Sequence, residues 1–237
     1  MGKASAEALA AEGAIVVVAD LDGTGAHQVA EQIRASGGEA TGYPVDVSST
    51  YQLREMFDRI SEQFGSLDVV FSHAGIQGPP GLDVPEELFD SVVDINVKSH
   101  FFCTSYALPL LRRSVTGGSI IYTASTAGLR GMPISPLYGL AKAAILSLMR
   151  SVAVILGPEG VRANAICPGA IDTPFSKQFA HTIGMDEEEI QSRIVSRIPL
   201  GRIGQPTDVA GAVVFLASDR SKYITGTAIT IDGGSVA

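Results

Sequence analysis

Tyr138 and Lys142 stand four residues apart in a stretch that is rich in good helix formers. Residues with this spacing share one face of a helix, so the Lys142 ammonium can lie beside the Tyr138 phenol. A neighbouring positive charge favours the phenolate and lowers the pKa of a tyrosine from its usual value of about 10. Such a phenol can exchange a proton with an alcohol or a carbonyl near neutral pH. The same spacing is also common for a tyrosine and a lysine that simply face solvent.

Other polar side chains follow runs of apolar residues. Ser125 comes shortly after the run 119–123, and Asp20 ends the run 15–19. In open α/β sheets, ligands bind outside the carboxyl ends of the strands. There the Ser125 hydroxyl could donate to a substrate oxygen, and Asp20 could bind the two hydroxyls of an adenosine ribose. Each residue also has an ordinary interpretation, as a turn residue or a helix cap.

These residues must be positioned by an alternation of short apolar runs and helical segments. We expect six strands, at 15–19, 41–45, 67–71, 119–123, 161–166 and 228–231. We expect helices at about 2–11, 24–35, 50–64, 86–113, 137–156 and 206–217, and a mixed segment at 174–200 with one helix around 187–197. Strands that alternate with helices of ten or more residues predict βαβ units and a doubly wound, mostly parallel sheet.

Composition narrows the class of protein. The 237 residues are 46 % hydrophobic and 18 % charged, which is typical of a globular protein and excludes a disordered chain. The net charge of −8, without a cluster of Lys and Arg, argues against nucleic-acid and anionic-membrane partners. Because no linker or repeat divides the chain, we expect one domain, 1–237, with a substrate flap at about 174–200.

The cysteines and histidines point to no special chemistry. Cys103 and Cys167 are too few for a disulfide framework and predict reduced thiols in a cytoplasmic protein. The four histidines have no metal-ligand spacing, so we expect no metal. The first residues lack an apolar signal core, and no uninterrupted apolar run approaches the roughly 20 residues of a membrane span.

In their order, these motifs resemble those of the short-chain dehydrogenase/reductase family, from Gly2 to Gly234. The active-site pattern stands as Tyr138-Gly139-Leu140-Ala141-Lys142, with Ser125 thirteen residues before the tyrosine. Asn96 falls in the stretch 94–97, where the family carries its fourth catalytic residue. The segment 168–173 looks like the family's nicotinamide-side loop, and 231–234 resembles its C-terminal strand signature.

The resemblance implies a Rossmann-like enzyme that moves a hydride between NAD(H) and a secondary alcohol or ketone. Tyr138 would be the acid/base, and Lys142 would lower its pKa and bind the nicotinamide ribose. Ser125 would orient the substrate oxygen, and Asn96 would hold a water in the proton relay. Cofactor contacts would come from Tyr138, Lys142, Gly2, Asp20, Leu21, Asp46, Val47, His73, Ala74, Gly75, Pro168, Gly169, Ile171 and Thr173. A homotetramer, or a dimer, is implied through the helices around 88–113 and 137–157.

Two departures from the family pattern qualify this function. Ser72-His73-Ala74-Gly75 stands where the family usually has Asn-Asn-Ala-Gly, although hydrogen-bonding capacity is kept. The family begins with a central strand and the turn Thr-Gly-x-x-x-Gly-x-Gly, of which only the last glycine is present, as Gly2. We therefore expect two unpaired inner strand edges and weak cofactor binding. The alternative function is a catalytically impaired or non-catalytic relative of this family.

Two further expectations concern specificity. Asp20 is followed by Leu21-Asp22-Gly23-Thr24, without a basic residue, which favours NAD(H) over a cofactor with a 2′-phosphate. Leu129, Met132, Phe175 and Phe179 would give the substrate pocket an apolar lining, suited to a hydrophobic small molecule.

Overall fold

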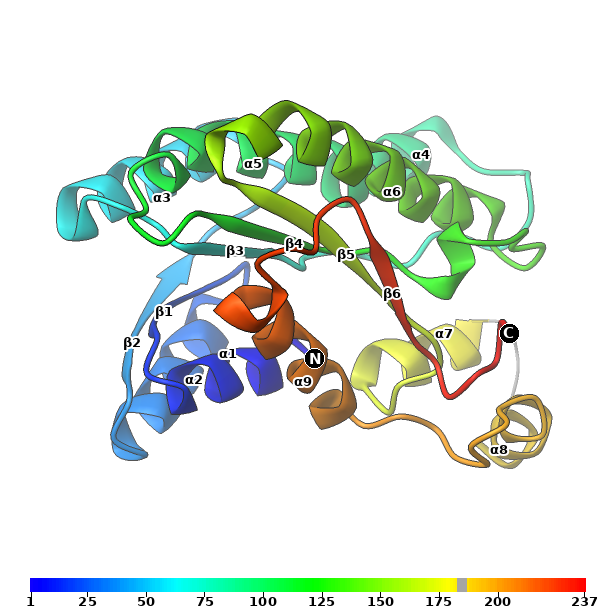
Figure 1. Cartoon of the computed structure of the whole chain (residues 1–237). Coiled ribbons are helices and arrows are strands. Elements are labelled where there is room, and N and C mark those ends of the chain that lie inside the picture. Colours follow the sequence, from blue (N-terminus) through cyan, green and yellow to red (C-terminus); the bar gives the residue numbers. More distant parts are fainter. Residues whose placement is uncertain (183–186) are drawn as a thin grey trace.

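The computed structural model of the chain describes residues 1–182 and 187–237 (Figure 1). Its strands are β1 (Ile15–Asp20), β2 (Glu39–Pro44), β3 (Val69–Ser72), β4 (Ser119–Thr123), β5 (Arg162–Pro168) and β6 (Ala228–Ile231). Its helices are α1 (Gly2–Ala11), α2 (Gly23–Ala35), α3 (Thr50–Phe64), α4 (Glu86–Val93), α5 (Ser99–Leu111), α6 (Pro136–Leu156), α7 (Pro174–Thr182), α8 (Glu187–Val195) and α9 (Pro206–Ala217). The predicted βα alternation and Rossmann-like α/β class are confirmed.

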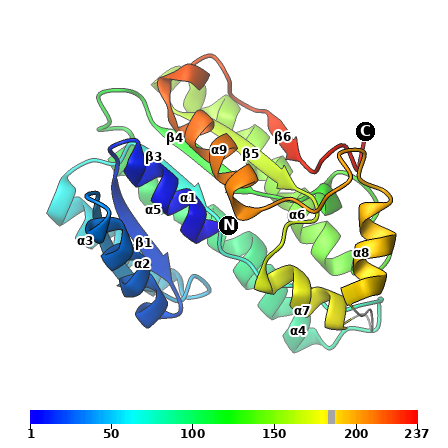
Figure 2. The ribbon, with the colours of Figure 1, turned by 90° about the horizontal axis from the view of Figure 1, so that it is seen from below.

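Helices cover both faces of the strands. Helices α3, α4, α5 and α6 lie on one face, and α1, α2 and α9 lie on the other (Figure 1). Seen from below, α1 runs between α2 and α9 (Figure 2). This two-sided cover explains why the strands read as short apolar runs rather than as alternating ones.

Local signals set the helix ends where the sequence predicts them. Asp22 accepts a hydrogen bond from the Gly25 amide at the start of α2, and Ser49 accepts one from the Gln52 amide at the start of α3. Gly65 ends α3 with a φ of +77°, a backbone conformation that residues other than glycine rarely adopt.

The strands form two parallel sheets instead of one. Strand β1 pairs with β2 from Ile15 opposite Glu39, and the second sheet has the order β3-β4-β5-β6. Among the described residues, neither β1 nor β3 has a ladder partner on its inner edge. A gap therefore lies between β1 and β3, where unpaired inner edges were expected, and these two strands do not pair with each other.

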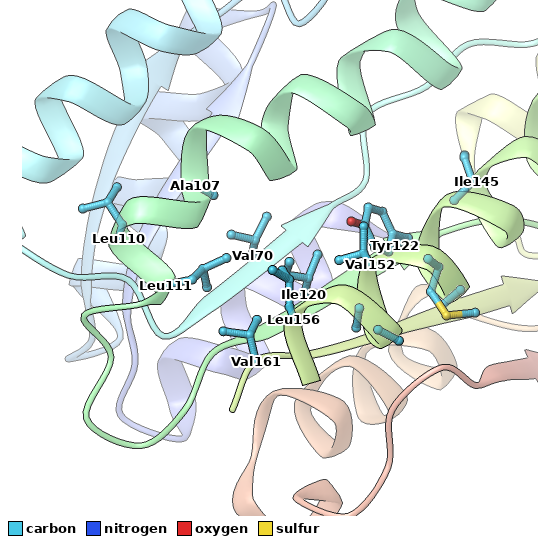
Figure 3. Close-up of a cluster of buried hydrophobic side chains, with 14 of the residues drawn as sticks. Val70, Ala107, Leu110, Leu111, Ile120, Tyr122, Ile145, Val152, Leu156 and Val161 are labelled. Atoms are coloured by element: carbon cyan, nitrogen blue, oxygen red, sulfur yellow. The ribbon is translucent and has the colours of Figure 1, made fainter. Parts of the chain in front are cut away.

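The main core lies between the four-stranded sheet and helices α3, α5 and α6 (Figure 3). Tyr122, Ile120 and Ile145 are fully buried within it. A second apolar cluster packs α9 on the opposite face of the same sheet, and a smaller one joins α2 to β1 and β2. The four-stranded sheet therefore carries most of the buried apolar surface.

Several predicted boundaries need correction. Strand β3 covers Val69–Ser72 and not 67–71, and β5 covers Arg162–Pro168 and not 161–166. The segment 174–200 contains α7 as well as α8, because Pro174 begins a helix, where its missing N–H costs nothing. Strand β2 starts at Glu39 and not at 41. The stretch 86–113 is α4, a π-helical turn at Asp94–Lys98 and α5 rather than one regular helix.

One helical stretch, Pro136–Glu159, is long and apolar enough to cross a membrane by length and composition alone. This is weak evidence for a membrane protein, because α6 is a core helix with Ile145 and Met149 fully buried against the sheet. Lys142 and Arg150 interrupt its apolar run.

Candidate active site

A cavity of about 2110 Å³ opens at the carboxyl ends of the strands and continues between β1 and β3. Ser125 and every predicted cofactor residue line it. These cofactor residues are Gly2, Asp20, Leu21, Asp46, Val47, His73, Ala74, Gly75, Tyr138, Lys142, Pro168, Gly169, Ile171 and Thr173. The sequence therefore predicted residues that the fold brings together from both sheets.

Helix α6 carries Tyr138 and Lys142 on one face, as their spacing predicts. The Lys142 ammonium lies 5.6 Å from the centre of the Tyr138 ring and donates to the Thr123 carbonyl over 2.9 Å. Lys142 is only 3 % exposed, and this burial lowers its pKa to about 8. The solvent-facing interpretation of this pair is excluded.

The ionisation of Tyr138 differs from the sequence-based expectation. Burial raises the pKa of Tyr138 to about 12, although a hydrogen bond with the Ser125 side chain acts in the opposite direction. The net lowering that the sequence predicts is not found in this structure, because the effect of burial on the pKa of Tyr138 dominates.

Ser125 has the capping role that its position allowed. Its Oγ accepts a hydrogen bond from the Ala127 amide over 3.1 Å and so caps a short 3-10 turn, Thr126–Gly128. The same hydroxyl lies 3.5 Å from the Pro168 carbonyl, at the loop after β5. This links the end of β4 to the loop predicted on the nicotinamide side.

Asn96 sits in the π-helical turn and does not line the cavity. Its Oδ1 accepts from the Ile76 amide and its Nδ2 donates to the Ile76 carbonyl, both over 2.8 Å. A Cβ at Gly75 would lie 2.8 Å from Asn96 Oδ1 and 3.4 Å from Lys142 Nζ, so this approach requires glycine. Both polar groups of the Asn96 amide are therefore engaged in fixing the loop after β3.

His73 lies where the first residues of α1 meet the end of β3. Its Nδ1 is 2.9 Å from Thr123 Oγ1, and its ring stacks on Phe71 with the centroids 5.0 Å apart. A Cβ at Gly2 would lie 3.0 Å from the His73 ring. Burial, together with the positive charges of the chain's amino terminus and Lys142, lowers the pKa of His73 to about 3, so the ring is neutral.

A buried pair beside this site was missed by sequence reasoning. Ser72 Oγ is hydrogen-bonded to His100 Nδ1 over 2.5 Å, and His100 is 1 % exposed. Burial, followed by the positive charge of Lys142, lowers the pKa of His100 to about 3. The serine in place of the family's asparagine at position 72 is a signal in the sequence that could have indicated this pair.

The acidic residues at the other end of the cavity have different hydrogen-bond partners. Asp22 caps α2, so Asp20 is not the cap; Asp20 accepts a hydrogen bond from the Asp22 amide over 3.0 Å and is exposed. Asp46 accepts from the Ser48 amide and hydroxyl, over 2.9 and 2.7 Å. Within the described residues, no ion pair joins Asp20 to a basic side chain.

The predicted substrate lining is met in part. Met132 and Phe175 line the cavity, and so does Ile134, which the sequence analysis did not name. Leu129 is 41 % exposed and does not line it. The side chain of Phe179 lies outside the described part of the chain. Among the side chains that are described, no three of His, Cys, Asp and Glu gather as a metal site.

Comparisons with known proteins identify similar oxidoreductases. The family profile described as enoyl-(acyl carrier protein) reductase matches residues 1–235. The chain is 38 % identical over 239 residues to L-rhamnose 1-dehydrogenase (NAD(P)(+)) of Azotobacter vinelandii, covering 99 % of this chain and 91 % of that protein.

Two solved structures share the fold over the whole chain. A short-chain type dehydrogenase/reductase from Mycobacterium marinum has a TM-score of 0.91 at 33 % identity, covering 100 % of this chain and 91 % of that one. Levodione reductase has a TM-score of 0.94 at 32 % identity, covering 100 % and 93 %. With the Ser125, Tyr138 and Lys142 arrangement and a profile match over nearly all residues, the chain belongs to the short-chain dehydrogenase/reductase family.

Proposed function

We propose that this oxidoreductase transfers a hydride between NAD(H) and a secondary alcohol or ketone that is a hydrophobic small molecule. The observation that carries the proposal is the meeting of Ser125, Tyr138 and the buried Lys142 in one cavity with Asp20. These groups come from the segment after β4, from α6 and from the end of β1, so one extended ligand can reach all of them.

The residues present fit a nicotinamide dinucleotide. Tyr138 and Lys142 would hold the nicotinamide ribose, and Asp20 would bind the hydroxyls of the adenosine ribose. The start of α1 has no acidic residue and no side-chain cap, so its amides can bind the pyrophosphate. The other predicted cofactor residues, which also line the cavity, would contact the rest of the dinucleotide. When bound, the cofactor supplies or accepts the hydride.

The chain's own groups then handle the proton and the substrate oxygen. The Tyr138 hydroxyl would pass a proton to or from that oxygen, while the Ser125 hydroxyl donates a hydrogen bond that orients it. The Lys142 ammonium, present below pH about 8, stabilises negative charge that develops on the Tyr138 oxygen. Asn96 would act on this relay by fixing the loop after β3, since its amide is engaged there.

The preference for NAD(H) follows from charge. A 2′-phosphate beside the adenosine ribose would meet the carboxylates of Asp20 and Asp22. The similar rhamnose dehydrogenase is named for both cofactors, so the preference must be measured on this chain. We expect kcat/KM with NADH to exceed that with NADPH at equal salt for a panel of cyclic and acyclic ketones. A preference for NADPH would contradict the assignment.

The alternative function is a catalytically impaired or non-catalytic relative of this family. Among the described residues, the cavity continues into the gap between β1 and β3, beside the start of α1. Mixing the protein with NADH and following cofactor fluorescence separates the two functions. A saturable change supports the enzyme, and its absence at millimolar cofactor supports the impaired relative.

We further propose a cytoplasmic homo-oligomer. Exposed apolar side chains on α5 and α6 suit a contact between subunits: Phe101, Leu140, Val154 and Ile155. Both cysteines are unpaired, which fits a reducing compartment. Light scattering at micromolar concentration should give the mass of a tetramer or dimer, and a monomer would contradict the proposal.

A further inference from the structure

A hydrogen bond connects two segments that are 98 residues apart at the mouth of the cavity. The Gln77 side-chain amide donates to the backbone carbonyl of Phe175, in the first turn of α7. Gln77 belongs to the loop after β3, and both residues line the cavity. The bond therefore joins the loop after β3 to the segment predicted as a substrate flap.

The Gln77 end of this connection is firmly anchored. The preceding residue, Ile76, is held through both its amide and its carbonyl by Asn96. Farther along the same loop, Ser135 Oγ donates to the Pro79 carbonyl over 2.9 Å, and the Gly81 amide donates to the Ile134 carbonyl over 3.0 Å. Gln77 thus extends from a loop that is fixed on both sides.

The Phe175 end is held mainly by local bonds. Ser176 and Thr173 exchange hydrogen bonds within the first turn, and Ser176 Oγ also donates to the Ile171 carbonyl over 2.6 Å. An exposed ion pair joins Lys177 to Asp172 over 3.4 Å. These partners all lie within five residues of Ser176. Gln77 supplies a fixed point from a different part of the fold.

The position of Phe175 matters because its ring faces Tyr138. The two ring centroids are 6.2 Å apart with an angle of 44° between the planes. Phe175 is 36 % exposed and lines the cavity, so its ring forms an apolar wall beside the phenol. A bond to the backbone of Phe175 controls where this wall stands.

We propose that Gln77 is a positioning residue that holds Phe175 against Tyr138 and thereby sets the apolar wall on which a substrate packs. The part that concerns substrate rests on the proposed function, whereas the part that concerns α7 does not. A neutral hydrogen bond contributes about 0.5–1.5 kcal/mol, which corresponds to a roughly two- to tenfold shift between the held and released positions.

The absence of tryptophan from the sequence allows a direct test in which no turnover is needed. Phe175→Trp introduces a single tryptophan at the wall. Adding Gln77→Met, which keeps the side-chain length and removes the donor, should shift the emission to longer wavelength and increase acrylamide quenching. The matched control is Gln63→Met, on an exposed position of α3. Equal quenching with and without Gln77 would overturn the proposal.

A second measurement protects the test against a tryptophan variant that does not fold. In the chain with native Phe175, hydrogen exchange of the α7 amides should be about two- to tenfold faster in Gln77→Met than in Gln63→Met. Unchanged exchange would contradict the proposal in the same way.

Kinetics then extend the test to substrate. Gln77→Met should raise KM for a hydrophobic ketone about two- to tenfold, with the KM for NADH and the pH profile unchanged. A loss confined to kcat would show that Gln77 does not set the wall. If fluorescence and exchange respond but no variant turns over any ketone, the position of Phe175 is explained and the proposed function fails.

Discussion

The two sheets differ in how far their strands are buried. Every residue of β4 is buried, whereas Ile15 in β1 is 57 % exposed and no residue of β1 is fully buried. Yet β1 has the sequence Ile15-Val-Val-Val-Ala-Asp20, which is apolar in successive positions and typical of a strand covered on both faces. Strand β1 therefore has the sequence of an interior strand although it lies at an open edge.

The candidate catalytic and cofactor-binding residues are also divided between the two sheets. Ser125 follows β4 of the four-stranded sheet, and Tyr138 and Lys142 lie on helix α6. In the other sheet, Asp20 ends β1 and Asp46 follows β2. A ligand that contacts all of them must join the two halves. Cofactor binding and the relative position of the sheets are therefore linked.

The largest expected effect comes from filling the gap. Adding an apolar strand and a glycine-rich turn ahead of Met1 should increase NADH affinity about 10²- to 10⁴-fold, since two bonds to the pyrophosphate would each contribute about 1.5–3 kcal/mol. The melting temperature should also rise, because the inner edges of β1 and β3 gain partners. Calorimetric titration of both lengths measures the difference, and equal affinities would show that another part of the chain replaces the turn.

Removing the Tyr138 hydroxyl tests the four-stranded half alone. Tyr138→Phe, made in the chain with the added strand, should lower kcat by about 10²- to 10⁴-fold, because it deletes the proton donor and keeps the ring. The melting temperature should stay close to that of the parent. A variant with near-normal kcat would show that Tyr138 is not the acid/base.

Two matched substitutions compare the sheets in stability. Ile120→Ala, at a fully buried position of β4, should reduce the free energy of unfolding by about 2–5 kcal/mol. Ile15→Ala in β1 should cost less than about 1 kcal/mol, because more than half of that residue is already exposed. Urea unfolding gives both values, and similar costs would mean that the edge of β1 is covered in solution.

A pH dependence of stability is expected from Lys142. Its pKa of about 8 in the folded protein is below the ordinary value of 10.5, so the unfolded chain binds more protons between these values. Stability contributed by this site therefore rises as the pH increases from 8 toward 10, with a full range on the order of 3 kcal/mol. Lys142→Met should remove this rise relative to the parent in urea unfolding at both pH values. An identical pH dependence in the two proteins would contradict the assignment.

Patterns that are local in the sequence predicted most of the fold and the cavity lining. The spacing of Tyr138 and Lys142 predicted that they share one face of a helix, and the apolar run 119–123 predicted β4 with its correct limits. What could not be predicted depends on contacts between distant segments. The bonds of Asn96 to Ile76 and of Ser72 to His100 join residues 20 and 28 positions apart. The pKa of Tyr138 was misjudged because burial is a property of the folded chain, not of the spacing to Lys142.

The open inner edge of β1 also bears on how the protein behaves on storage. An unpaired strand that is apolar, β-branched and free of proline and of charge over 15–19 is a template on which other chains can add strands. A net charge of −8 opposes association, and salt weakens that repulsion. Turbidity should therefore grow faster at high salt than at low salt, and proline at Val17 should suppress it. Because of the same edge that leaves the cofactor cavity open, we expect the colloidal stability of the protein to fall as the ionic strength rises.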